Sequence, residues 1–277
     1  MAATVELRDG RALGYAEWGP GDGFPILGFG GTTMSRLAHV GREAPDAAGV
    51  RLVLVDRPGY GLSDHQPGRR LLDWPGDVAQ VADALGVERF AVFGMSGGGP
   101  HAAACGYALP ERVSAVGLVS SPGPVWDRRE LRFSLPPHRQ PLIEVAARDP
   151  GEAAQQLLED CRRQLDEARR DARHGDVADP EVRERLRAAL LETAARGPDG
   201  YARDLFVLFI SPWGFMPEEI SVPTVIWHGD RDPAVPLDIA RFYDRTVPRS
   251  KLHVVRGEGH LLLWSRTEEI LRSLRPG

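Results

Sequence analysis

The 277-residue chain is poor in cysteine, in lysine and in long apolar runs, and each shortage narrows what it can be. Its two cysteines, Cys105 and Cys161, are too few for a disulfide framework. No apolar run reaches the roughly 20 residues that a membrane-spanning helix needs. The first residues also lack the basic and apolar parts of a secretory signal. We therefore expect a cytoplasmic protein that has no membrane partner.

The charge pattern and the histidine spacing also argue against several kinds of partner. The net charge is −5 and Lys251 is the only lysine, so no basic surface for nucleic acid is expected. The histidines show neither an H-E-x-x-H motif nor a paired-cysteine spacing, and no Lys-Ser/Thr pair follows the glycines at 97–99 as in a phosphate loop. We expect no metal and no cofactor, only a small-molecule substrate. The oligomeric state is not predicted.

The most informative motif is the pentapeptide Gly94-Met95-Ser96-Gly97-Gly98, which has the form G-x-S-x-G. A β-rich apolar run at 89–93 precedes it and an alanine-rich segment at 100–109 follows, so Ser96 stands at a strand-to-helix turn. Such a turn has no room for side chains two residues before and after the serine. It holds the hydroxyl at a helix N-terminus, where negative charge is favoured. A plain Gly-rich loop is the alternative, and the flanking strand and helix disfavour it.

A serine hydroxyl acts as a nucleophile only with a base, and the base needs an orienting acid. The C-terminal third supplies both. An apolar strand pattern at 224–228 runs into Asp230 and Asp232, and another at 252–255 runs into His260. The chain order Ser, Asp, His, each just after a predicted strand, is that of an α/β hydrolase. Ser96 is the predicted nucleophile and His260 the predicted base, while His228 and His101 are expected to be structural.

A hydrolase of this kind also needs two backbone N–H groups to hold the developing oxyanion. One comes from Gly97, the residue after the nucleophile. The predicted strand at 25–29 leads into Gly30-Gly31-Thr32, where the glycines allow a close approach to substrate and Thr32 can offer its N–H. Thr32 and Gly97 are therefore the predicted oxyanion hole.

On these motifs the chain resembles the α/β-hydrolase superfamily, and most of all bacterial serine esterase-like members with a helical cap. The oxyanion loop of those proteins reads roughly F-H-G-T-P-G-S-R, and this chain agrees with it at Phe29, Gly31, Thr32, Ser35 and Arg36. Gly30 replaces the usual His, Thr33 the Pro and Met34 the Gly. The usual His helps to pin the loop, so Gly30 leaves the rigidity of the loop open.

The resemblance extends to segments 56–63, 212–215 and 220–235 and implies a fold. It predicts an α/β-hydrolase fold with a mostly parallel eight-stranded sheet flanked by helices. Unalternated apolar runs such as 52–55 agree, because they indicate strands buried on both faces. Residues 1–121 and 212–277 would form the core, and residues 122–211 a helical cap inserted between strands 6 and 7. The family pattern also selects Asp232, rather than Asp230, as the acid.

The segment 122–211 carries no usable family motif, but its periodicity predicts helices around 154–168 and 182–193. Asp179 is the expected N-cap of the second helix, which ends before Gly197. A further helix is expected at 36–48. Candidate substrate-binding residues are Gly31, Met95, Trp126, Phe206 and Trp213, with Phe133, Leu135, Phe209 and Phe215 as further lining candidates. Packing inside the cap is the alternative for its apolar residues.

A serine at the nucleophile position limits the reactions that are expected. Epoxide hydrolases and haloalkane dehalogenases of this fold carry Asp where this chain has Ser96, so they are set aside. A serine indicates acyl transfer through an acyl-enzyme, with a carboxylic ester as the default substrate and lactones, thioesters or amides as alternatives. A lyase, a perhydrolase, a carbon–carbon bond hydrolase, or a ligand-binding module that retains the triad stays open.

Overall fold

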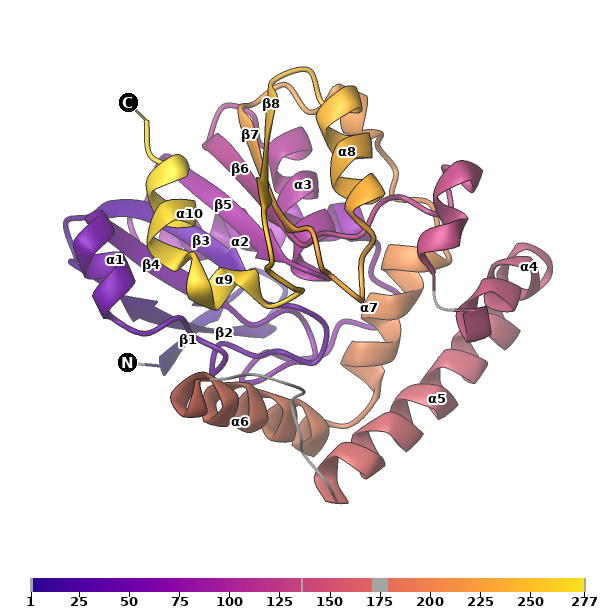
Figure 1. Ribbon diagram of the computed structural model, residues 1–277. Helices are drawn as coiled ribbons and strands as arrows, with labels where there is room; N and C mark the ends of the chain where they lie inside the picture. The colour runs from indigo at the N-terminus through magenta and orange to yellow at the C-terminus, as the bar shows by residue number, and fades with distance from the viewer. Residues whose placement is uncertain (1, 136, 171–178, 277) are drawn as a thin grey trace.

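The computed structural model describes residues 2–135, 137–170 and 179–276. Its strands form one eight-stranded sheet in the order β1-β2-β4-β3-β5-β6-β7-β8 (Figure 1). The strands are β1 (Ala2–Glu6), β2 (Ala12–Trp18), β3 (Phe24–Phe29), β4 (Val50–Val55), β5 (Phe90–Met95), β6 (Val113–Val119), β7 (Thr224–Gly229) and β8 (Ser250–Val255). β1 and β2 form an antiparallel hairpin, β2 is antiparallel to β4, and the other pairs are parallel. The predicted α/β fold is confirmed.

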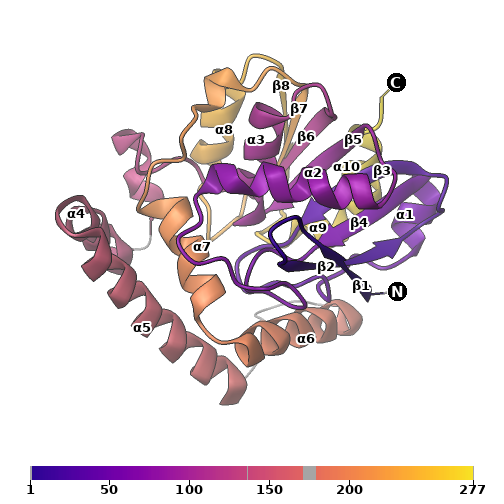
Figure 2. The ribbon, with the colours of Figure 1, turned by 180° about the vertical axis from the view of Figure 1, so that it is seen from behind.

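Helices cover both faces of this sheet (Figures 1 and 2). One face carries α2 (Trp74–Ala84), α3 (Gly98–Ala108) and α8 (Leu237–Thr246), and the other carries α1 (Glu43–Ala48), α9 (Leu262–Ser265) and α10 (Thr267–Ser273). Side chains alternate along a strand, so Leu27 is buried on the first face and its neighbour Ile26 on the second. Both faces are therefore apolar, which accounts for the unalternated runs of the sequence.

The helix expected at 36–48 is shorter, because α1 begins only at Glu43. The Arg36 N–H donates to the Asp56 carboxylate at 2.6 Å, a contact that the start of a helix could also make. Gly41 also has a φ of 86°, a left-handed conformation that a helix cannot contain. The expectation was wrong at this point because the left-handed backbone of Gly41 interrupts the helical pattern two residues before α1 begins.

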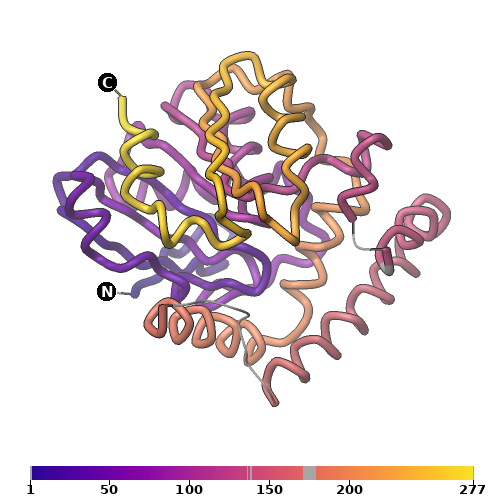
Figure 3. Tube along the Cα trace, viewed as in Figure 1, coloured from indigo at the N-terminus to yellow at the C-terminus, as the bar shows by residue number. Residues whose placement is uncertain are grey.

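Residues 122–211, here called the insert, lie between β6 and β7. Their helices are α4 (Gln140–Arg148), α5 (Pro150–Arg170), α6 (Pro180–Arg196) and α7 (Asp199–Phe209). Asp179 caps α6 as expected, since its carboxylate accepts the N–H groups of Glu181 and Val182. α4 and α5 lie far from β1 and α10 (Figure 3). The insert thus lies beyond the carboxyl ends of the parallel strands, where α6 contacts the loops that follow β3 and β4.

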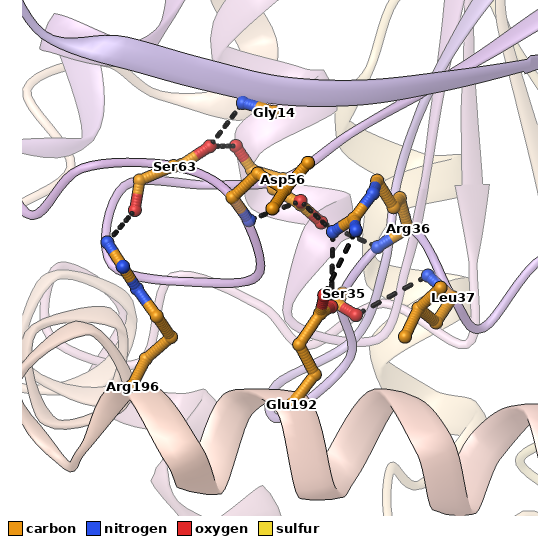
Figure 4. A network of polar contacts seen from close by, with 9 residues as sticks. Gly14, Ser35, Arg36, Leu37, Asp56, Ser63, Glu192 and Arg196 are labelled. Atoms are coloured by element: carbon orange, nitrogen blue, oxygen red, sulfur yellow. Dashed lines mark hydrogen bonds and ion pairs between the residues drawn. The ribbon is translucent and has the colours of Figure 1, made fainter. Parts of the chain in front are cut away.

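Polar contacts attach α6 directly to core loops (Figure 4). Arg36, in the loop after β3, pairs with Asp56 at 2.7 Å and with Glu192 of α6 at 3.0 Å. Arg196 of α6 donates to the carbonyl of Ser63 at 2.9 Å. A small apolar cluster of Ala38, Val182, Leu186 and Ala189 lies beside these contacts. The loops after β3 and β4 are therefore braced by the insert.

Candidate active site

Ser96 occupies a strained turn between β5 and α3. Its φ is 49°, in the left-handed region that non-glycine residues rarely adopt. A Cβ at Gly94 would lie 2.0 Å from the carbonyl oxygen of Gly98, and a Cβ at Gly98 would lie 2.1 Å from that of Phe29. Only glycine fits at either position. The turn has the geometry that the G-x-S-x-G motif predicts.

His260 and Asp232 come together from the loops that follow β8 and β7. His260 Nδ1 lies 2.8 Å from Asp232 Oδ2 and 3.0 Å from Oδ1. Burial alone would raise the pKa of the Asp232 carboxyl. The hydrogen bond and charge of His260, with the N–H groups of Val235 and Ala234, bring that pKa below its usual value. An anionic Asp232 favours the proton on Nδ1, which leaves His260 Nε2 free to accept one.

The rival candidates for these roles have other partners. Asp230 accepts the N–H of Gly257 at 2.6 Å and so stabilises a turn. His228 is buried, and its Nε2 lies 2.9 Å from the carbonyl of Val235 and 3.4 Å from Asp232 Oδ2. Burial lowers the pKa of His228, which favours a neutral ring. His228 thus packs under the acid, as expected for a structural histidine.

Ser96 and His260 line the same cavity, of about 530 Å³. The core contributes the backbone of Thr32 and Gly97 and the loop at 233–236. The insert contributes most of the remaining wall: Phe133, Ser134, Leu135, Pro137, Arg139, Leu205 and Phe209. Phe133, Leu135 and Phe209 therefore lie where the sequence placed them. The cavity is largely apolar, with the reactive side chains at one part of its wall.

The loop after β3 lies against the nucleophile. A Cβ at Gly31 would be 3.3 Å from Ser96 Cβ, and a Cβ at Gly97 would be 3.2 Å from Thr32 N. Within the described ranges, neither the Thr32 nor the Gly97 N–H donates to a backbone carbonyl outside the regular elements. Two adjacent N–H groups beside a serine hydroxyl are the components of an oxyanion hole.

Arg57 holds this loop by two of its backbone carbonyls. Its guanidinium donates to the carbonyls of Gly30 and, at 2.9 Å, of Gly31. The same guanidinium donates from Nε to Asp204 of α7 at 2.8 Å, and Arg69 binds the other oxygen of that carboxylate. Burial would raise the pKa of Asp204, but Arg57 and Arg69 hold it far below its usual range.

Sequence reasoning missed this cluster. Arg57 lies in the segment 56–63 that carries the family resemblance, but its partner Asp204 lies in the insert, where acids and arginines are nearly balanced. A solvated helix face was the natural interpretation of that pattern. Asp204 and both arginines are in fact buried.

Several predicted substrate-binding residues do not line the cavity. Met95 is 1% exposed and packs on the face of α1, α9 and α10, because side chains alternate along β5. Trp213 is also buried and donates its indole N–H to the carbonyl of Leu208 at 3.0 Å. Trp126 and Phe206 pack against the main core cluster. Among the described residues that line the cavity, none of the five candidates is present, although the backbone of Gly31 passes close to Ser96.

The described residues contain neither a cluster of metal-binding side chains nor a membrane-spanning helix. No three or more His, Cys, Asp or Glu residues are grouped so that they could hold a metal ion. No helix within the described ranges is long and apolar enough to cross a membrane.

Comparison with known proteins places the chain in a family. A sequence model of the alpha/beta hydrolase fold matches residues 28–267. The chain belongs to the α/β-hydrolase fold family. A 2-hydroxy-6-oxononadienedioate/2-hydroxy-6-oxononatrienedioate hydrolase of Burkholderia vietnamiensis is 28% identical to this α/β hydrolase over 280 residues, 96% of this chain and 91% of the relative.

Solved structures show the same fold. A bromoperoxidase of Bacillus anthracis is 22% identical, with a TM-score of 0.75 over 99% of this chain and 98% of its own. An esterase of Exiguobacterium antarcticum is 19% identical, with a TM-score of 0.74 over 99% of this chain and 98% of its own. At these identities the likeness concerns the fold and not the substrate.

Proposed function

We propose that this α/β hydrolase is a serine hydrolase that cleaves a carboxylic ester, or a related acyl bond, of a small and largely apolar substrate. The observation that carries the proposal is the His260–Asp232 pair, whose histidine lines one cavity with the strained Ser96. A histidine held by a buried carboxylate, in the same cavity as a half-buried serine, is an arrangement for nucleophilic acyl transfer.

In the proposed reaction His260 Nε2 takes the proton of Ser96 Oγ as that oxygen attacks the acyl carbon. The N–H groups of Thr32 and Gly97 stabilise the tetrahedral oxyanion. His260 then gives its proton to the departing alcohol, which leaves an acyl-enzyme on Ser96. Water, activated by the same histidine, attacks this ester and releases the acid. Asp232 stabilises the imidazolium in both steps.

The insert serves in this proposal as a cap over a core of residues 1–121 and 212–277. Its apolar side chains Phe133, Leu135, Leu205 and Phe209 line the cavity beside Ser96. Walls of this kind exclude water and shape the acyl site. A cytoplasmic location, expected from the sequence, stays a prediction.

One relative supports a second candidate function. The substrates in the name of the Burkholderia vietnamiensis relative are oxo diacids without an ester group, so their hydrolysis breaks a bond beside a ketone. The same Ser-His-Asp set can serve carbon–carbon bond hydrolysis. Turnover of 6-oxo-dienoic acids but not of para-nitrophenyl esters would favour this candidate.

The test is the replacement Ser96→Ala. It should lower kcat for para-nitrophenyl esters by a factor on the order of 10⁴ or more, because the oxygen that would attack the acyl carbon is removed. A fluorophosphonate probe should label the wild type and not this variant. Ser114→Ala, on β6 and outside the cavity, is the matched control and should keep both labelling and turnover. Near-normal hydrolysis by Ser96→Ala would refute the proposal, and tight ligand binding without turnover by the wild type would indicate a binding module.

A further inference from the structure

Among the described residues that line the cavity, one carries a permanent charge. Arg139, at the end of the 3₁₀ turn Pro137–Arg139, lines the cavity with Ser96 and His260. The other described lining residues are apolar, small or hydroxyl-bearing, apart from His260 itself. A guanidinium remains protonated at any physiological pH, so Arg139 brings a fixed positive charge to a mostly apolar wall.

Arg139 has no counter-ion among the described residues. It lies close to the hydroxyl of Tyr201 and the thiol of Cys161, and burial raises the pKa of both groups, that of Cys161 to about 12. Both neighbours are therefore neutral. The acids that also act on Cys161 are already paired, Asp160 with Arg163, and Asp204 with two buried arginines.

The backbone adds to the positive potential at this place. Arg139 is the N-cap residue of α4, whose first turn carries no acidic side chain. The N-terminus of a helix bears a partial positive charge, so a cation there is disfavoured and an anion is favoured. An uncompensated guanidinium and a helix N-terminus thus meet at one wall of a largely apolar cavity.

We propose that Arg139 binds a carboxylate carried by the substrate, at a point other than the acyl group that Ser96 attacks. The substrate class is then a mono-acyl derivative, such as a monoester, of a dicarboxylic acid. This inference rests on the proposed hydrolase function. One planar guanidinium matches one carboxylate, whereas a phosphate dianion would leave a second charge uncompensated between apolar walls. The dioates in the name of the Burkholderia vietnamiensis relative agree with this class.

The experiment compares matched ester pairs. Para-nitrophenyl hydrogen adipate and its pimelate and suberate homologues carry a free carboxylate, and the corresponding methyl para-nitrophenyl diesters do not. The readout is the ratio of kcat/KM for each acid to kcat/KM for its methyl ester. We expect a ratio above one in the wild type for at least one chain length. In Arg139→Gln that ratio should fall about 10- to 100-fold, mostly through KM, as for the loss of a charged hydrogen bond.

The control is Arg129→Gln, which removes the same charge from an exposed position of the insert outside the cavity. It should leave the ratio unchanged. A second readout needs no turnover: monomethyl adipate should raise the melting temperature of Ser96→Ala more than dimethyl adipate does, and adding Arg139→Gln should abolish that difference.

The outcomes separate the two proposals. The proposed carboxylate site is wrong if the wild type has the same kcat/KM for the neutral diesters as for the acids, or if Arg139→Gln keeps the wild-type ratio. The proposed hydrolase function is retained in either case. If no ester is hydrolysed and the probe does not label Ser96, the hydrolase fails. The melting temperatures then still decide whether Arg139 binds a carboxylate, and equal shifts for the two adipates would overturn it.

Discussion

The core and the insert share one cavity and contribute different chemistry to it. The core supplies Ser96, His260 and the N–H groups of Thr32 and Gly97, all on turns that follow parallel strands. The insert supplies apolar walls and the charge of Arg139. In the proposed function the core thus determines which kind of bond is attacked, and the insert determines which molecule fits around it. This division explains how one fold serves many substrates.

The two regions are not independent, because ion pairs join residues of the insert to residues of the core. Asp204 of α7 holds Arg57, and Arg57 holds the carbonyls of the oxyanion loop. Glu192 of α6 holds Arg36 in the same loop region. The insert therefore supports loops of the core that take part in the proposed reaction. The following predictions measure how far the two regions are separable.

The largest effect is expected within the core. Asp232→Asn should lower kcat by about 10⁴, because an amide cannot stabilise the imidazolium and favours the wrong tautomer of His260. Asp230→Asn, two residues away, removes only a turn contact to Gly257 and should cost far less. Steady-state kinetics of both variants would test this. Equal losses, or a larger loss for Asp230→Asn, would contradict the assignment of the acid.

The same contrast explains what could be predicted from sequence. Ser96, Asp232 and His260 were predictable because each follows an apolar strand and lies in a short motif whose spacing the turn itself imposes. Asp204 and Arg139 were not, because their roles depend on burial between helices that the local pattern does not reveal. Met95 was wrongly expected in the site because adjacency in sequence places neighbouring side chains on opposite faces of a strand.

The next effect concerns the free energy of unfolding and is expected at Asp204, where the insert contacts the core. Asp204→Asn should destabilise the fold by about 3–5 kcal/mol, since it leaves Arg57 and Arg69 buried without their counter-ion. Asp199→Asn, on the exposed start of α7, is the control and should change stability little. Urea unfolding at neutral pH measures both.

The pH dependence of the same variant gives a second check. The folded-state pKa of Asp204 is depressed, so its contribution is complete above the unfolded pKa of about 4 and is lost as the pH falls below it. Asp204→Asn should therefore lose less stability than the wild type below about pH 4. If the folded variant keeps full kcat, the contacts of Asp204 stabilise the fold but do not affect catalysis. The two regions are then more independent than we infer.

The next effect concerns the oxyanion loop itself. Thr32→Pro removes the backbone N–H and should cost roughly 3 kcal/mol of transition-state stabilisation. Thr32→Ala keeps the N–H and should be mild. The comparison of kcat/KM for the two variants separates a backbone role from a side-chain role. An equally large loss in Thr32→Ala would mean that the hydroxyl, and not the N–H, acts on the substrate.

The smallest effect is expected at His101, which touches both regions. Its Nδ1 lies 2.9 Å from the Gly97 carbonyl at the nucleophile turn, and its Nε2 lies 3.7 Å from Asp204 of the insert. Burial lowers the pKa of His101 to about 3. Between that value and the unfolded pKa of about 6.5, the unfolded chain binds a proton that the folded chain does not. Stability should therefore fall by about 1.4 kcal/mol per pH unit from about pH 6 to pH 4 through this residue.

His101→Asn should remove that part of the slope, because an amide does not titrate and can still donate to the Gly97 carbonyl. His253→Asn, on β8 and less buried, is the matched control and should leave most of the slope in place. Urea unfolding at several pH values measures all three proteins. Equal slopes in the wild type and His101→Asn would mean that the ring takes up its proton without unfolding. Asp204 could then accept a hydrogen bond from the protonated ring, and the core and the insert would be coupled by pH at this point.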